Sequence, residues 1–424
     1  MPDPNPHREK AEKIFRHSLE SHNPARVVSG FILGNKYLLP ADSHIDLVAT
    51  GKSGPAMARG ALAVLGDGIE RGLVITNAPG GELPGRIRII HSSHPVPDDR
   101  SLESAVQLME FVSSAGDDST LLYLMSGGTS AMVALPEKGI SLDEKRELTS
   151  VLLNGGIEIG DLNLVRSFFS GIKGGKLSNR IKAQNAIALV ISDVLTNDLS
   201  TIGSGVLYPR PVDPREVVTI LEKYGVQSNN PVVAKCIGIA KRGNSEVPAH
   251  GMQVEHYIID SNESFVNDLS ITAEKEGYKT FVSPKPFTGD VGRAVEQFFR
   301  WASGYPAEAG QPLMLIAGAE TGVVVKGAGR GGRNSEFAMR SATHIAGSNC
   351  VLLAAGTDGI DGITQSAGAI IDGGTYKKGE ALGLNFEEML ANNNSGGWCD
   401  STGSSLVTGH TGINLADVLL LIKA

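Results

Sequence analysis

Cysteine is scarce in this sequence, and its scarcity excludes a disulfide scaffold. The 424 residues include three cysteines, Cys236, Cys350 and Cys399, at spacings unlike those of zinc ligands. A disulfide-rich domain needs several pairs, and a structural zinc site needs ligands at short, regular spacings. We therefore expect a protein of a reducing compartment, the cytoplasm.

Long apolar runs and an excess of positive charge are also missing. No run of 18 apolar residues occurs, and the first ten residues are polar, so we expect neither a membrane span nor a signal peptide. The formal net charge of −8 disfavours binding to nucleic acid through phosphates. We expect small-molecule ligands as partners, with the assembly left open, a homodimer included.

Glycine, by contrast, is abundant, with 52 residues, which is about 12% of the chain against a typical ~7%. Many glycines follow short apolar runs of the kind found in buried parallel strands, separated by helical patterns. This alternation predicts an α/β protein whose N-terminal sheet is mostly parallel. We expect two domains, residues 1–245 and 246–424. Helices are expected at 141–159, at 162–182 with an interruption at residues 173–176, and after Asn414.

Four loops after predicted strands are rich in small or hydroxyl-bearing residues: 51–54, 126–130, 327–334 and 356–362. Ligands of parallel α/β sheets bind beyond the carboxyl ends of the strands, so these loops predict a phosphate-rich ligand. The loop 327–334 leads into a predicted helix and contains two arginines, which suits an anion, although a solvated surface turn is the alternative. The predicted phosphate-binding residues are Ser126, Gly127, Gly128, Thr129, Ser130, Asn197, Gly331, Gly332 and Asn334.

Charged residues beside these loops are candidates for catalysis. Lys52 could neutralise a transferred phosphoryl group or hold a carboxylate, or be a surface lysine. Asp193 could hold magnesium, accept a proton from a hydroxyl, or cap the following turn. Glu320 and Asp358 are further metal candidates, although aspartates such as Asp358 and Asp361 more often form turns.

Histidine and serine offer weaker candidates. His91 and His94 have no third metal ligand nearby in the sequence, so we interpret them as structural or at the edge of a site. Ser126 or Ser130 could act as a nucleophile, but the segment Ser-Gly-Gly-Thr-Ser lacks the G-x-S-x-G pattern.

Longer motifs resemble those of a known family. They are GKSGPAMARGA (51–61), HPVPD (94–98), SGGTSAMVALP (126–136), NLVR (163–166), IKGGKL (172–177), SDVLTNDLSTIGSG (192–205), AETGVVVKGAGRGGRNSEFA (319–338), GTDGIDGITQSAGA (356–369) and TGHTGIN (408–414). In this order they resemble the glycerate kinases with a C-terminal MOFRL domain. The chain departs from the family pattern at Val206, at Ala319 and in the segment 409–414, which affects details of nucleotide contacts.

The resemblance implies phosphorylation of D-glycerate by ATP, usually at the 2-hydroxyl, with Mg²⁺. It also implies a three-layer N-terminal domain, a smaller C-terminal α/β domain and an active site in the cleft between them. Lys52 and Arg333 match residues that the family associates with substrate binding and catalysis, and we add Ser53 to the substrate-binding candidates.

Two other functions remain as alternatives. A hydroxypyruvate reductase would need a dinucleotide site, but no predicted strand is followed by G-x-G-x-x-G with an acidic residue ~20 positions later. A non-catalytic protein that binds phosphorylated metabolites would not need so many polar loops drawn from both halves of the chain.

Overall fold

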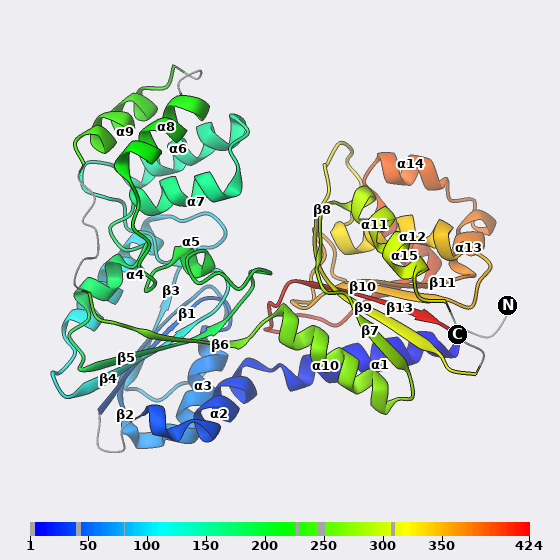
Figure 1. Cartoon of the computed structure of the whole chain (residues 1–424), viewed down its shortest axis with the longest axis horizontal. Helices are drawn as coiled ribbons and strands as arrows, with labels where there is room; N and C mark the ends of the chain where they lie inside the picture. The colour runs from blue at the N-terminus through cyan, green and yellow to red at the C-terminus, as the bar shows by residue number, and fades with distance from the viewer. Residues whose placement is uncertain (1–4, 40–43, 80, 226–228, 244–250, 307–309) are drawn as a thin grey trace. The chain divides into compact units, whose positions relative to one another are not determined.

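The computed structural model describes residues 5–39, 44–79, 81–225, 229–243, 251–306 and 310–424. The chain forms two compact units, each described here by itself (Figure 1). The first unit comprises Pro24–Ile191 and Asn197–Ile259, and the second comprises Met1–Asn23, Ser192–Thr196 and Asp260–Ala424. The predicted domain boundary between residues 245 and 246 lies outside the described residues and stays a prediction.

The first unit contains a six-stranded sheet in the order β3-β2-β1-β4-β5-β6. Its strands are β1 (His44–Thr50), β2 (Ile69–Thr76), β3 (Ile87–His91), β4 (Ser119–Met125), β5 (Asn185–Ile191) and β6 (Glu255–Asp260). The pairs β3–β2, β2–β1, β1–β4 and β4–β5 are parallel, which confirms the predicted parallel sheet. The carboxyl ends of β1 and β4 therefore lie together, because Thr50 pairs with Met125.

Helices cover both faces of this sheet, with α2 and α3 on one side and α4 and α5 on the other (Figure 1). The remaining helices, α6 to α9, pack around a separate apolar core that includes Leu152, Phe168 and Leu221. The helices of the first unit are α2 (Pro24–Gly34), α3 (Gly54–Leu65), α4 (Asp99–Ser113), α5 (Thr129–Met132), α6 (Leu142–Asn154), α7 (Ile159–Phe168), α8 (Pro214–Tyr224) and α9 (Pro231–Lys241).

Three predictions for this unit were wrong in detail. The helix expected over 162–182 ends at Phe168, before the interruption expected at residues 173–176, where Gly174 and Gly175 adopt positive φ angles of 66° and 81°. Helix α9 was not predicted from the sequence, although Asn230 caps it and a proline follows in its first turn. Strand β6 lies within the predicted C-terminal domain, residues 246–424, but belongs to the first sheet.

The second unit contains a mixed seven-stranded sheet in the order β12-β11-β10-β13-β9-β7, with β8 also paired to β9. Its strands are β7 (Lys279–Val282), β8 (Phe287–Asp290), β9 (Leu313–Gly322), β10 (Val351–Gly356), β11 (Gly368–Asp372), β12 (Ser405–Leu406) and β13 (Asp417–Lys423). Helices α1 and α10 cover one face, and α11, α12 and α15 cover the other (Figure 1). The helices are α1 (Pro6–Ser21), α10 (Asn262–Lys275), α11 (Val291–Ser303), α12 (Arg333–Ile345), α13 (Thr375–Ala381), α14 (Phe386–Ala391) and α15 (Ser395–Thr402).

The expected C-terminal helix is strand β13, which pairs on both sides, antiparallel to β10 and to β9. Its sequence, DVLLLIK, is apolar on both faces because helices cover both sides of the sheet at this central position. Such a run fits a buried helix and a central strand equally well, and the length of seven residues favours the strand. No helix within the described ranges is long and apolar enough to cross a membrane.

Candidate functional site

Lys52 lies at the carboxyl end of β1, in contact with the loop that follows β4. Its backbone N–H donates to the Gly127 carbonyl oxygen at 2.9 Å. Gly128 adopts a positive φ of 92°, and a Cβ there would lie 3.4 Å from Lys52 Cγ and 3.1 Å from His94 Cδ2. The half-buried side chains of Lys52 and His94 therefore flank the loop 126–130, and the two predicted loops form one surface.

Two of the predicted phosphate-binding hydroxyls form hydrogen bonds to other groups of the protein within this surface. Ser126 Oγ donates to the Thr50 carbonyl oxygen at 3.2 Å and accepts the Ser53 N–H at 3.1 Å. Thr129, fully buried, donates to the Ser126 carbonyl oxygen at 2.8 Å. Because these hydroxyl protons are used within the protein, the phosphate-binding roles of Ser126 and Thr129 stay predictions. Ser130 is half-exposed and has different neighbours.

Ser130 lies among cations that the sequence-based candidates omitted. Its Oγ is 2.7 Å from Lys173 Nζ, 2.7 Å from Ser204 Oγ and 3.4 Å from an Arg166 guanidinium nitrogen. Arg166 and Lys173 belong to motifs noted in the sequence, but they stand 36 and 43 residues from Ser130. Their place in these motifs was the only indication in the sequence that Arg166 and Lys173 matter. Their distance along the chain gave no reason to expect them beside Ser130.

Asn197 also fits a ligand-binding role in the first unit. Its Oδ1 atom is buried without a hydrogen-bond partner among the described residues, and its φ is 52°. An unpartnered buried amide oxygen is costly unless a ligand supplies a donor or a cation. The predicted role of Asn197 in binding the nucleotide stays a prediction.

The electrostatics of His94 provide a test of this geometry that does not depend on function. Burial lowers the pKa of His94 below 6.5, and the positive charge of Lys52 lowers it further. We expect Lys52→Ala to raise the pKa of His94, which would still stay below 6.5 because burial is the larger cause. An NMR pH titration, with the imidazole signal assigned by loss in His94→Gln, measures it. The exposed control Lys138→Ala should leave the pKa unchanged, and no rise in Lys52→Ala would contradict this placement.

In the second unit, Arg333 pairs with Asp417, which the sequence analysis did not single out. The Arg333 Nε and Nη2 atoms donate to the two carboxylate oxygens, Nη2 at 2.9 Å. The side chain of Asp417 is 1% exposed and that of Arg333 is 42% exposed. Burial raises the pKa of Asp417 to about 6 although Arg333 opposes the shift. Asp417 escaped notice because its segment was predicted to be a helix.

Three acidic residues lie close enough to Arg333 to raise its pKa. Burial alone would lower the pKa of Arg333, but the hydrogen bonds and charge of Asp417, together with the charges of Glu320 and Asp358, raise it. Asp358 and Asp417 also lie on either side of Gly356, where a Cβ would be 3.1 Å and 3.2 Å from their Oδ1 atoms. Two of the three predicted metal-binding acids, Glu320 and Asp358, are therefore neighbours of Arg333.

Asp193, the third of these acids, accepts a hydrogen bond from Asn414 Nδ2 at 3.4 Å. A turn at residues 195–196 follows Asp193, and no helix begins directly after it, so the metal, proton-accepting and turn-capping roles of Asp193 all stay predictions. Within the described ranges no group of three or more acidic, histidine or cysteine side chains could hold a metal ion by itself.

The glycine-rich loop 327–332 is explained by packing. A Cβ on Gly327, Gly329 or Gly331 would lie 2.2–2.5 Å from atoms of the segment 392–396. Asparagine side chains there accept backbone N–H groups of the loop, as Asn393 Oδ1 does from Gly327 at 3.0 Å. These glycines let the loop lie against another segment of the chain, so their abundance is no evidence of a phosphate-binding backbone.

The N-terminus of α12 already holds an anion, the Asp361 carboxylate. Its oxygens accept the Asn334 and Ser335 N–H groups at 2.9 Å and 2.8 Å, while the Gly332 N–H donates to Ser335 Oγ at 3.0 Å. Asp361, interpreted from sequence as turn-forming, therefore caps this helix. A phosphate could use these donors only by displacing Asp361, so a phosphate role for Gly331, Gly332 and Asn334 has lost its main support and stays a prediction.

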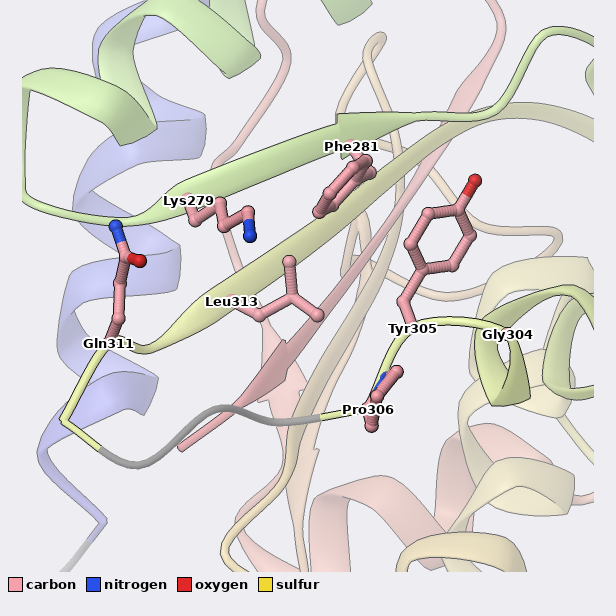
Figure 2. A pocket seen from close by; sticks show the side chains of 7 residues that line it. All are labelled: Lys279, Phe281, Gly304, Tyr305, Pro306, Gln311 and Leu313. Carbon is pink, nitrogen blue, oxygen red and sulfur yellow. The ribbon is translucent and has the colours of Figure 1, made fainter.

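A pocket of about 200 Å³ lies elsewhere in the second unit (Figure 2). Figure 2 shows the side chains of Lys279, Phe281 and Tyr305 around it. None of the predicted site residues lines this pocket, and we assign it no function.

Comparison with known proteins gives full-length matches. Residues 10–237 match the family described as Domain of unknown function (DUF4147), and residues 313–417 match the MOFRL family. The D-glycerate 2-kinase of Thermotoga maritima is 34% identical over 99% of each chain. A crystal structure of a glycerate kinase from that organism matches with a TM-score of 0.87 and 33% identity over 99% of this chain and 100% of the other.

A differently named relative is also similar. A protein of Agrobacterium vitis named as a hydroxypyruvate reductase is 31% identical over 89% of this chain and 98% of its own length. The N-terminal and C-terminal family matches, the kinase relative and the solved structure agree with one another over the whole length. The chain therefore belongs to the glycerate 2-kinase family, whose members join a DUF4147 domain to a MOFRL domain.

Proposed function

We propose that this chain transfers the terminal phosphoryl group of ATP to the 2-hydroxyl of D-glycerate, with Mg²⁺, in the cytoplasm. The observation that supports this most is the placement of Lys52 at the carboxyl end of a parallel strand, against the loop 126–130. Phosphoryl transfer depends on positioning and on neutralising negative charge, which an ammonium group at such an edge supplies. We propose D-glycerate as the substrate because the chain belongs to the glycerate 2-kinase family.

Arg333 is the second cationic residue in this proposal. Two of its three guanidinium nitrogens hold Asp417, and Nη1 makes no hydrogen bond to any described residue. The side chain is 42% exposed, so Nη1 can reach a ligand. A guanidinium fixed on one side by a carboxylate is pre-organised to bind a second anion, the carboxylate of glycerate or a phosphate. Arg333 therefore binds and orients substrate in our account.

The acidic residues fit a magnesium ion bound partly by nucleotide phosphates. Proteins hold Mg²⁺ through one or two carboxylates, with water and substrate phosphates completing the shell. Asp358 and Glu320, near Arg333, or Asp193 would hold the ion, which when bound offsets the charge of the phosphates. Asp193 is also the candidate to accept the proton of the attacking hydroxyl.

The structure speaks against a reductase. Gly327, Gly329 and Gly332 have the spacing G-x-G-x-x-G, but Asn392 and Asn394 fill the space beside the first two, and Asp361 occupies the donors of the following helix. A dinucleotide pyrophosphate needs that space and those donors. A protein that only binds phosphorylated metabolites would retain the same cations, so kinetics must separate it from a kinase.

The direct test measures ADP release from ATP with the purified chain. We expect turnover that depends on D-glycerate, is lost with excess EDTA and returns with added Mg²⁺, because ATP needs a cation to offset its charge. NADH oxidation with hydroxypyruvate, measured in parallel, should stay at background. ADP release that does not depend on D-glycerate, or that persists in EDTA, would contradict the proposal.

A further inference from the structure

The surroundings of Ser130 contain positively charged side chains that pair with no described carboxylate. Ser130 lies shortly after the carboxyl end of β4. Three other segments approach it: α7 with Arg166, the turn with Lys173, and the turn at Ile202–Ser204. Lys173 donates to both the carbonyl oxygen of Ser130, at 2.8 Å, and its Oγ, at 2.7 Å. Three polar side chains from separate parts of the chain thus converge on Ser130.

The cations in this cluster are bonded to neutral groups. Lys173 is 2% exposed and bonds to Ser130, and Lys145 is 8% exposed and bonds to the carbonyl oxygens of Arg166 and Phe169. Among the residues that the structure describes, no carboxylate forms an ion pair with Arg166, Lys173 or Lys145. The nearby Glu137 pairs instead with Lys176 at 2.8 Å.

Burying uncompensated cations side by side is unfavourable. Burial lowers the pKa of Lys173, and the charges of Lys145 and Arg166 lower it further. Burial likewise lowers the pKa of Arg166, and that of Lys145 to about 7. Buried charges are normally paired, and breaking such a pair is strongly destabilising. An anion bound at Ser130 would supply the missing negative charge.

One hydroxyl of the Ser130–Ser204 pair can donate to such an anion, since either oxygen can be the donor within the pair. A serine oxygen can accept two hydrogen bonds and donate one. With Lys173 and Arg166 as donors to Ser130 Oγ, its own proton goes to Ser204 Oγ at 2.7 Å. The Ser204 proton then has no acceptor among the described side chains and is available to a ligand. Ser204 adopts a φ of 58°, an unfavourable angle for serine that often marks a functional site.

We propose that Arg166, Lys173, Ser130 and Ser204 form a binding site for a small oxyanion, a phosphate group of the nucleotide or the carboxylate of glycerate. This site adds a substrate-binding contact to the proposed function. Only the identity of its ligand rests on that function. Arg166 and Lys173 supply the charge, and the two hydroxyls fix the orientation. The cluster lies on the same sheet edge as Lys52, because both loops follow neighbouring parallel strands.

Binding measurements on the full-length chain test the site. Isothermal titration with inorganic phosphate, ADP and D-glycerate, each alone, would be compared for wild type, Arg166→Gln, Ser130→Ala and Lys173→Met. We expect at least one ligand to lose about tenfold or more in affinity in Arg166→Gln and Lys173→Met, as for a charge-assisted contact. Loss for phosphate and ADP identifies the nucleotide as the source, and loss for D-glycerate alone identifies its carboxylate. The exposed Arg215→Gln is the matched control.

Unfolding measurements distinguish this binding site from a purely structural role of the same residues. Turnover measurements distinguish a failure of the site from a failure of the proposed kinase function. Without ligand, Lys173→Met should be as stable as wild type or more stable, because it removes an uncompensated buried charge. Wild-type affinity for all three ligands in both Arg166→Gln and Ser130→Ala would overturn the site, whatever Lys173→Met does. A chain that binds phosphate through Arg166 yet never phosphorylates D-glycerate would refute the proposed function and leave the site standing.

Discussion

Lys52→Ala is expected to lower kcat/KM for D-glycerate by about 10²–10³, the loss typical of one charge-stabilising donor at a transition state. The ammonium is half-buried beside the loop 126–130, where its attraction for a transferred phosphoryl group is less screened than in bulk water. The melting temperature should change little, because no described carboxylate pairs with Lys52. Steady-state kinetics and thermal melts measure both.

The control for Lys52 is Lys138→Ala, an exposed lysine of the same unit. It should keep wild-type kinetics, since a surface charge away from the site contributes little. If Lys52→Ala retained more than about a tenth of the wild-type kcat/KM, the lost interaction would be worth less than about 1.4 kcal/mol. Lys52 would then be a surface lysine, the alternative that the sequence left open.

Arg333→Ala is expected to lower both activity and stability, with a stability loss that grows with pH. Removing the arginine leaves Asp417, 1% exposed, without its cation. Truncating one partner of a buried ion pair costs about 3–5 kcal/mol, and the 42% exposure of Arg333 puts the loss at the lower end. Activity should fall because the substrate loses a guanidinium ligand.

The pH dependence follows from the pKa of Asp417. In the wild type, burial raises the pKa of Asp417 from 3.8 to about 6. Between these two pH values the folded state binds more protons than the unfolded state, so the free energy of unfolding falls as the pH rises. Without Arg333 the pKa rises further, and stability continues to fall above pH 6. The melting-temperature difference between wild type and Arg333→Ala should therefore be small at pH 5 and large at pH 8.

Two variants control the Arg333 experiment. Adding Asp417→Asn to Arg333→Ala should restore most of the stability at pH 8 without restoring turnover, because it removes the buried charge but returns no guanidinium. Arg330→Ala, three residues earlier, should have small effects, since Arg330 pairs with Asp400 on the surface. An equal stability loss at pH 5 and pH 8 in Arg333→Ala would show that Asp417 is not the group responsible.

The sequence was sufficient for the fold class because its strands are short apolar runs that end in glycine or serine. β1, β4 and β5 were recognisable on that ground. The segment Asp417–Lys423 was misjudged because a central strand covered on both faces has no period-two pattern, and so resembles a buried helix. The glycines at positions 174 and 175 indicated an interruption, but α7 already ends at Phe168, which residue periodicity did not indicate.

The position of Lys52 beside another loop was predictable because this charged residue directly follows a strand, and its role stays a prediction. The glycines of the loop 327–332 had two explanations in the sequence, because glycines that admit a phosphate and glycines that admit another segment look alike there. Asp361 and Asp417 act through partners 27 and 84 residues away, and Arg166 and Lys173 reach Ser130 across 36 and 43 residues. Such groupings exist only in the folded chain.

The most direct test of the central claim is the identity of the reaction product. The purified chain would be incubated with ATP, Mg²⁺ and D-glycerate and followed by proton-coupled ³¹P NMR. A phosphate ester at C2 couples to one proton and gives a doublet, whereas an ester at C3 couples to two and gives a triplet. We predict the appearance of the doublet as ATP is converted to ADP. A triplet would contradict transfer to the 2-hydroxyl, and no new ester signal would contradict the kinase itself.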